Sequence, residues 1–131
     1  MEQSLIEGMQ VYLAAGVAMD LDAMDALYDD EFVNVRVDLD GRTVTLTKGM
    51  FMQRFRAMRE QGQALGPADD ATFLATTIYG DFGQIVMRRV NEGEPVLYTF
   101  VWRMRDGQAV TMLREFTFDK DLSYLLQLMN Q

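Results

Sequence analysis

Glu115 is the residue of this chain best suited to transfer a proton inside a protein. The alternating stretch 109–118 predicts a strand, and the residues that it places on the Glu115 face are Thr111, Leu113 and Thr117. If that face lines a cavity, the loss of water raises the pKa of the Glu115 carboxyl toward values useful in acid–base catalysis. The alternative is an ion pair with Arg103 or Arg105 at the surface of the sheet.

Two arginines could hold a ligand oxygen. The guanidinium fork of Arg36 or Arg89 fixes the orientation of an anionic or carbonyl oxygen, but an internal salt bridge with a carboxylate such as Glu115 or Asp38 is an equal alternative. Residues 32–38 alternate, and the two sets are Asn34, Arg36 and Asp38 on one face and Val33, Val35 and Val37 on the other. Either set could face inward.

The composition excludes several kinds of site. The chain has no cysteine and no histidine, so thiolate nucleophiles, Ser–His pairs and metal sites that need these ligands are ruled out, and we expect no metal and no cofactor. The net charge of −8 argues against nucleic acid as a partner, because phosphates require a basic face. Acid–base chemistry must therefore use carboxylates, tyrosines, lysines or water.

Length and hydrophobicity predict the class of protein. The 131 residues suit one domain, and the 49% hydrophobic content is enough for a core. No stretch approaches the roughly 20 apolar residues of a membrane span, and no basic region followed by an apolar run begins the chain. We expect a cytoplasmic protein without a membrane partner.

The periodicity predicts an α+β fold. The predicted helices are 5–17, a short acidic helix capped by Asp20 or Asp22, a helix capped by Thr47 and ended by Gly62, and 122–129. The predicted strands are 32–38, 43–46, 72–79, 84–91, 96–105 and 109–118, with Asp29 and Asp30 marking the turn into the first. This order predicts a curved, mainly antiparallel sheet packed on three helices, with a cavity at its open end.

An aromatic row in the predicted strand 96–105 bears on assembly. Tyr98, Phe100, Trp102 and Met104 share one face of this strand, where they form either the core or a dimer interface. If this row makes the exposed face of the sheet apolar, that face needs cover, which predicts a homodimer. The eleven methionines are interpreted as gap fillers of the core.

Two segments carry a resemblance to a known family. The segment 12–32 contains a helix, a step at residues 20–22, a short acidic helix and the start of a strand, and the segment 102–116 ends in Arg-Glu-Phe after a charged turn. Their order resembles the nuclear transport factor 2-like superfamily, which includes ketosteroid isomerases and SnoaL-like cyclases. The resemblance implies a cone-shaped α+β domain over residues 1–131 with one pocket.

The resemblance to ketosteroid isomerases implies one shared residue and two differences. Tyr12 matches their tyrosine that hydrogen-bonds the substrate oxygen, although a core position is the alternative for Tyr12. Their catalytic base falls on Arg36 and their protonated aspartate near Val101. Arginine cannot accept a proton and valine cannot donate one, so that mechanism is not expected here.

Two further enzyme groups with this fold supply candidate residues. The Asp–Arg–Asp set of limonene epoxide hydrolases is similar to Arg89, Asn91 and Glu115, but Asn91 lacks the acidic proton that opens an epoxide. The single acid–base aspartate of SnoaL-like cyclases is matched by Glu115 or Asp38, which makes these two the candidate proton shuttles.

Three functions follow as hypotheses. The first is a protein that binds a small hydrophobic ligand, with Tyr12, Arg36, Arg89 and Asn91 as binding residues. The second is a cofactor-free SnoaL-like enzyme that acts on a hydrophobic carbonyl compound through Glu115 or Asp38. The third is a dimerisation or assembly domain without catalysis, which a cavity below roughly 300 Å³ would favour.

Overall fold

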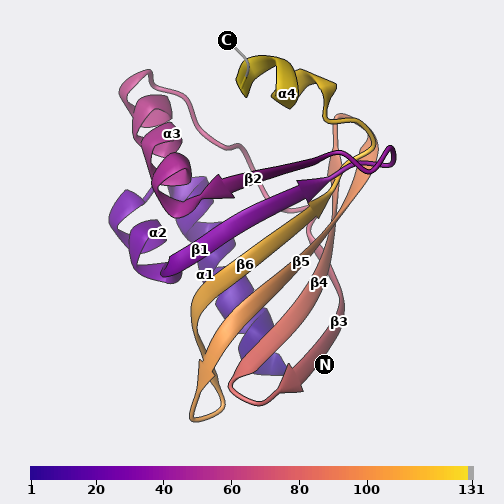
Figure 1. Cartoon of the computed structure of the whole chain (residues 1–131). Helices are drawn as coiled ribbons and strands as arrows, with labels where there is room; N and C mark the ends of the chain where they lie inside the picture. The colour runs from indigo at the N-terminus through magenta and orange to yellow at the C-terminus, as the bar shows by residue number, and fades with distance from the viewer. Residues whose placement is uncertain (130–131) are drawn as a thin grey trace.

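The computed structural model describes residues 1–129 and shows one six-stranded sheet with helices on its inner face and at one end (Figure 1). The elements in order are α1 (Gln3–Ala18), α2 (Leu21–Leu27), β1 (Tyr28–Val37), β2 (Thr43–Thr47), α3 (Lys48–Glu60), β3 (Thr72–Tyr79), β4 (Phe82–Asn91), β5 (Glu94–Arg105), β6 (Gln108–Phe118) and α4 (Ser123–Met129). The strand order is β2-β1-β6-β5-β4-β3, and β1 and β6 are the parallel pair in an otherwise antiparallel sheet. The predicted α+β class is confirmed. No helix within residues 1–129 is long and apolar enough to cross a bilayer.

The step between α1 and α2 follows from its two cap residues. Met19 ends α1 in the left-handed conformation, with φ 51°, and its amide reaches back to the carbonyls of the last turn. Asp20 then caps α2, because its carboxylate accepts a hydrogen bond of 3.2 Å from the Ala23 amide. Of the two predicted caps, Asp20 and Asp22, the structure uses Asp20.

Strand β1 starts earlier than the sequence pattern predicted. It begins at Tyr28, directly after α2, so the turn predicted at Asp29 and Asp30 is wrong. Tyr28 is almost fully buried and pairs with Met112 of β6, and this pairing extends the strand toward the N-terminus as far as Tyr28. The polar set of β1 faces inward, and its three valines face outward.

A β-bulge in β6 changes which residues lie beside Glu115. Val101 of β5 pairs with Arg114 of β6, but the next residue, Trp102, pairs with Met112, so Leu113 is the extra residue. Strict alternation had placed Thr111 on the Glu115 face. The bulge reverses this, because Met112 is buried in the core and Thr111 lies on the opposite face, bonded to Asp29.

The aromatic row of β5 faces the helices. Trp102 and Phe100 are fully buried, so the row is part of the core and does not form the outer face of the sheet. The core includes a close contact between α1 and β4 at Gly83. A Cβ added there would lie 2.8 Å from Leu5 Cδ2, so glycine is what lets α1 approach the sheet.

Candidate functional site

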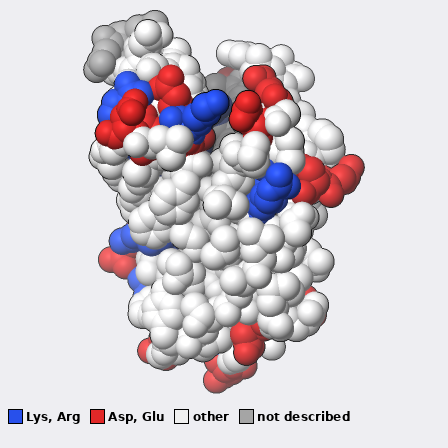
Figure 2. Space-filling view, turned by 90° about the vertical axis from the view of Figure 1, so that its right-hand side faces the viewer, with Lys and Arg blue, Asp and Glu red and all other residues white. Residues whose placement is uncertain are grey.

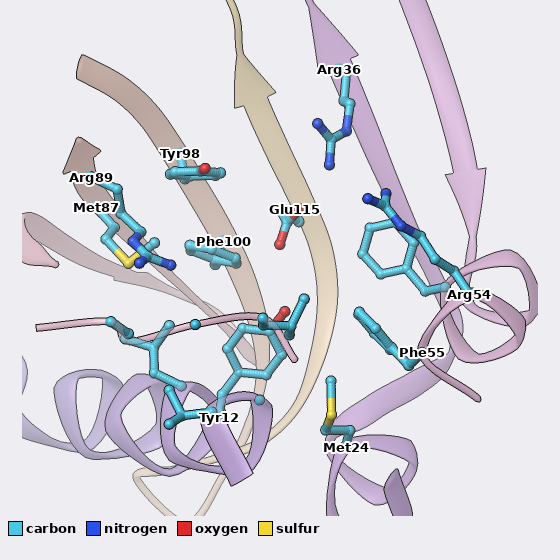
Figure 3. Close-up of a pocket in the computed structure, with 17 residues that line it drawn as sticks. Tyr12, Met24, Arg36, Arg54, Phe55, Met87, Arg89, Tyr98, Phe100 and Glu115 are labelled. Atoms are coloured by element: carbon cyan, nitrogen blue, oxygen red, sulfur yellow. The ribbon is translucent and has the colours of Figure 1, made fainter. Parts of the chain in front are cut away.

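A cavity of about 230 Å³ lies between the inner face of the sheet and the helices α1, α2 and α3. Figure 3 shows aromatic and aliphatic side chains on its walls and a few polar groups that point into it. The apolar lining includes Met24, Phe51, Phe55, Met87, Tyr98 and Phe100, and the polar lining is Tyr12, Arg36, Arg54, Arg89 and Glu115. An apolar pocket with few polar groups is the usual form of a small-molecule site.

Glu115 is held in the cavity wall by neighbours on β1 and β6. Asn34, opposite it in the parallel register, donates from Nδ2 to Glu115 Oε2 at 2.7 Å. Arg36 Nε donates to Asn34 Oδ1 at 3.0 Å, which fixes the orientation of this amide, and the Thr117 hydroxyl lies 3.4 Å from the same carboxylate oxygen. The other oxygen, Oε1, has no hydrogen-bond partner among residues 1–129 and remains available to a ligand.

Burial changes the protonation of Glu115. It raises the pKa of the Glu115 carboxyl from 4.5 to about 7, against the opposing effects of the Arg36 charge and the Thr117 hydrogen bond. Glu115 is only 6% exposed, so the missing hydration is the dominant effect. Near neutral pH the protein therefore holds both the acid and the carboxylate form, as a general acid or base requires.

Two tyrosines form a hydrogen-bonded pair beside Glu115. The hydroxyls of Tyr12 and Tyr28 are 2.7 Å apart and their rings meet edge to face, with centroids 5.6 Å apart. Burial, with the nearby Glu115 charge, raises the pKa of Tyr12 far above its ordinary value, so the hydroxyl stays protonated. If Tyr28 donates within the pair, the Tyr12 proton is free to bond a ligand oxygen in the cavity.

The three arginines of the cavity differ in their partners. Arg89 donates to the Pro67 carbonyl at 2.9 Å and to Asp70 at 3.0 Å, so it holds the segment before β3 against β4. Arg36 forms a long ion pair of 3.8 Å with Asp119. The alternative prediction, an internal salt bridge of Arg36 or Arg89 with Glu115 or Asp38, is therefore wrong. Arg54 has no ion pair and no side-chain hydrogen bond within the described chain.

Asp38 lies outside the cavity, at the hairpin between β1 and β2. Its carboxylate accepts hydrogen bonds from the amides of Asp40, Arg42 and Leu122 and from the Arg42 guanidinium, at 2.8–3.1 Å. Burial acts to raise its pKa, but these hydrogen bonds and the Arg42 charge outweigh it and lower the pKa of Asp38. A carboxylate so occupied joins α4 to the hairpin and is not placed to shuttle protons in the cavity.

Two further predictions about the site are wrong: Asn91 does not line the cavity, and Glu115 does not pair with Arg103. Asn91 is exposed at the end of β4 and lies outside the cavity lining. The predicted surface pair between Glu115 and Arg103 does not form, because Arg103 bonds Asp29 and Glu31, each at 2.7 Å, on the other face of the sheet. Sequence analysis missed Arg54, although it lies three residues after Phe51 and so beside it on α3; its side chain is exposed at the edge of the cavity.

A second, larger hollow adjoins the cavity beneath α4. Its volume is about 1120 Å³, and Arg36, Arg54 and Tyr98 line both spaces. These three residues therefore mark the mouth of the cavity. No group of three or more acidic residues in the described part of the chain is arranged to hold a metal ion.

Comparisons with known proteins identify the fold. An NTF-2-like protein of unknown function from Silicibacter pomeroyi is similar over 88% of this chain and 92% of its own, with a TM-score of 0.64 and 12% identity. A conserved protein from Planctomyces limnophilus is similar over 89% and 94%, with a TM-score of 0.67 and 14% identity. A putative calcium/calmodulin-dependent protein kinase type II association domain from Thiobacillus denitrificans is similar over 87% and 93%, with a TM-score of 0.58 and 17% identity. Neither a protein-family model nor a curated protein matches this sequence.

The sheet, the helices on its inner face and the cavity between them define the class of this α+β protein. This is the nuclear transport factor 2-like fold, as the resemblance in the sequence predicted.

Proposed function

We propose that this protein binds a small, mostly apolar molecule of about one ring in the cavity beside Glu115. The observation that supports this most directly is the open oxygen of a buried carboxylate in an apolar wall. A donor on a ligand would bond this oxygen in place of water, and a hydrogen bond to a charged group contributes about 1.5–3 kcal/mol.

The size of the cavity sets the size of the ligand. Its volume of about 230 Å³ lies below the roughly 300 Å³ of sites for drug-sized molecules. By the criterion of the sequence analysis, a cavity of this size favours an assembly domain. It exceeds, however, the ~150 Å³ of an engineered apolar cavity that binds benzene. Because a buried carboxylate opens into the space, we favour a one-ring ligand over a vacant packing defect.

A thermal-shift screen with one-ring alcohols, amides, ketones and acids, together with native mass spectrometry, tests this function. Gly16 lines the cavity, and Gly16→Leu should fill part of it and abolish the thermal shifts. The matched control is Gly49→Leu on α3, where an added Cβ has no neighbour closer than 3.9 Å. No shift with any compound and no co-purifying molecule would contradict the proposal.

A second candidate function is cofactor-free proton transfer at a carbon next to a carbonyl group. It is favoured by a carboxyl whose pKa is about 7 in the same cavity as the Tyr12 hydroxyl. The Glu115 carboxylate would take the proton from carbon, and Tyr12 would donate a hydrogen bond to the enolate oxygen. The same carboxyl would then return a proton or, in D2O, a deuteron.

Deuterium exchange measured by NMR tests this second candidate. Wild-type protein should speed exchange into a one-ring ketone in D2O, Glu115→Gln should not, and Tyr12→Phe should be slower than wild type. Exchange at the buffer rate with wild-type protein would exclude the enzyme and leave the binding function intact.

We also propose that two copies pair through the outer face of the sheet. One uncharged row crosses five strands in register, and its members are Val35, Phe116, Thr99, Val86 and Ala75. Figure 2, seen from the right-hand side of Figure 1, shows a broad uncharged surface with charged groups at its upper end, on its flanks and at its lower end. Light scattering should show a dimer that Thr99→Arg dissociates; a wild-type monomer would contradict the pairing.

A further inference from the structure

The charges in the cavity are opposite to those of the whole chain. The protein has 20 acidic and 12 basic residues, yet the charged groups that line the cavity are three arginines and Glu115. With Glu115 partly protonated near neutral pH, the cavity is locally positive. Such a reversal of sign attracts an anion to this place and to few others on an acidic surface.

Arg36 and Arg54 concentrate this charge at the mouth. They come from β1 and α3, line both the cavity and the hollow beneath α4, and direct their guanidinium groups into the same region (Figure 3). Each guanidinium carries five donors. Arg36 uses its Nε on Asn34, which leaves its terminal nitrogens, and Arg54 has no side-chain partner within residues 1–129.

The nearby carboxylate does not neutralise this pair. The distance from Asp119 Oδ2 to Arg36 Nη1 is 3.8 Å, and this oxygen is buried without a hydrogen bond from any described residue. Asp119 and Arg54 both line the hollow beneath α4, but no carboxylate within residues 1–129 lies within ion-pair distance of Arg54, so one carboxylate faces two guanidinium groups and the pair keeps a net positive charge. Two like charges directed at one region repel each other, and an anion between them removes that repulsion.

We propose that the ligand is a one-ring molecule bearing a carboxylate, which Arg36 and Arg54 bind at the mouth while the ring lies among the aromatic side chains of the cavity. The planar guanidinium fork matches a carboxylate with two parallel hydrogen bonds, so a carboxylate is held in both position and plane. The ring then fills the space lined by Phe51, Phe55 and Phe100. The opposite end of the ligand, near Glu115, is where a hydroxyl or amide proton or an acidic C–H group belongs.

This inference rests on the proposed binding function and adds the charge of the ligand. Isothermal titration with matched pairs tests it: benzoate against benzamide, and phenylacetate against phenylacetamide, each pair similar in shape and different in charge. On wild-type protein the acids should bind about tenfold tighter than the amides, the size of one good charged hydrogen-bonding contact. The preference should fall as salt is raised.

Arg54→Gln is the decisive variant, because Arg54 is exposed on one side and supports no other residue by a hydrogen bond within the described chain. It should reduce the preference for the acids to about twofold, because it weakens the binding of the charged acids more than that of the neutral amides. Arg56→Gln, the control, removes the same charge from the same helix at an exposed position outside the cavity lining and should keep the tenfold preference.

The outcomes separate this inference from the binding function. Equal binding of acids and amides by wild-type protein, or an unchanged preference in Arg54→Gln, overturns the carboxylate assignment and leaves the binding function standing. Failure of every acid and every amide to bind refutes both.

Discussion

Replacing Glu115 with glutamine should stabilise the protein at pH 8 and have little effect at acid pH. The glutamine side chain would keep an acceptor for Asn34 and nearly the same shape while removing the buried charge. The folded-state pKa of Glu115 is about 7, against 4.5 for an unhindered glutamate. Below pH 4.5 the carboxyl is neutral in both folded and unfolded chains, so its burial carries no charge penalty there.

The sign and size of the effect follow from this difference. Between pH 4.5 and 7 the unfolded chain releases the proton and the folded protein retains it, so the contribution of Glu115 to the free energy of unfolding falls as the pH rises. The fall is complete somewhat above pH 7. Over the range from pH 5 to 8 it amounts to about 2.5 kcal/mol at 1.36 kcal/mol per pKa unit.

Urea denaturation at pH 5, 6, 7 and 8, followed by circular dichroism, measures this quantity. The lowest pH stays above the isoelectric point of about 4.4, where solubility is poorest. The free energy of unfolding of Glu115→Gln minus that of wild type should grow by about 2.5 kcal/mol from pH 5 to pH 8. The other carboxylates are common to both proteins and cancel in this difference.

Glu60→Gln is the control for the loss of one negative charge, because Glu60 is exposed at the end of α3. Its difference from wild type should stay within about 0.5 kcal/mol over the same range. If Glu115→Gln also differs from wild type by a constant amount at all four pH values, Glu115 is not held in a desolvated wall. The raised pKa of Glu115, and its suitability for proton transfer in the cavity, would then be refuted as well.

Two further predictions concern the frame around the site. Gly83→Ala should lower the free energy of unfolding, measured in urea, by about 1–3 kcal/mol, because its Cβ would lie 2.8 Å from Leu5. The control Gly49→Ala on α3 should be neutral or stabilising. Equal effects of the two substitutions would contradict the close packing of α1 on β4. Asp38→Asn should loosen the joint between the β1–β2 hairpin and α4, because the Leu122 amide donates to Asp38 at 3.0 Å. Hydrogen exchange of the Leu122 amide should become at least about tenfold faster, with no change in the exposed Asp40→Asn, and unchanged exchange in both would show that α4 is held by other contacts.

The sequence predicted the elements well because their signals are local. Helical spacing, the Thr47 cap and the turns between strands each depend on a few adjacent residues, and the observed elements follow them. The start of β1 was misplaced because the burial of Tyr28 depends on its pairing with β6, more than 80 residues away in the chain. Local signals cannot contain a partner that distant.

The environment of Glu115 could be predicted only in part. Its type and strand position marked it as a candidate, but alternation alone cannot reveal the bulge at Leu113, which changes the neighbours on its face. Asn34 belonged to a polar set that could face either way. It faces inward because the parallel pairing of β1 with β6 places it opposite Glu115, and no residue of β1 indicates that pairing.

The polar face of β1 is the strongest sign that the cavity is functional. Asn34 and Arg36 occupy inward positions of a strand whose outward positions are valines, so this strand directs its polar side chains toward the core. Apolar residues of similar size in their place would often stabilise a fold, because burying charge costs more than it returns. Strand β1 breaks the usual pattern of apolar residues inward and polar residues outward, and it does so beside Glu115, a carboxyl that destabilises the folded state above pH 7. Such a break indicates a constraint on the sequence other than stability. Glu115→Gln separates the two constraints: the variant should be the more stable protein at pH 8 and the poorer one at exchanging protons with a ligand.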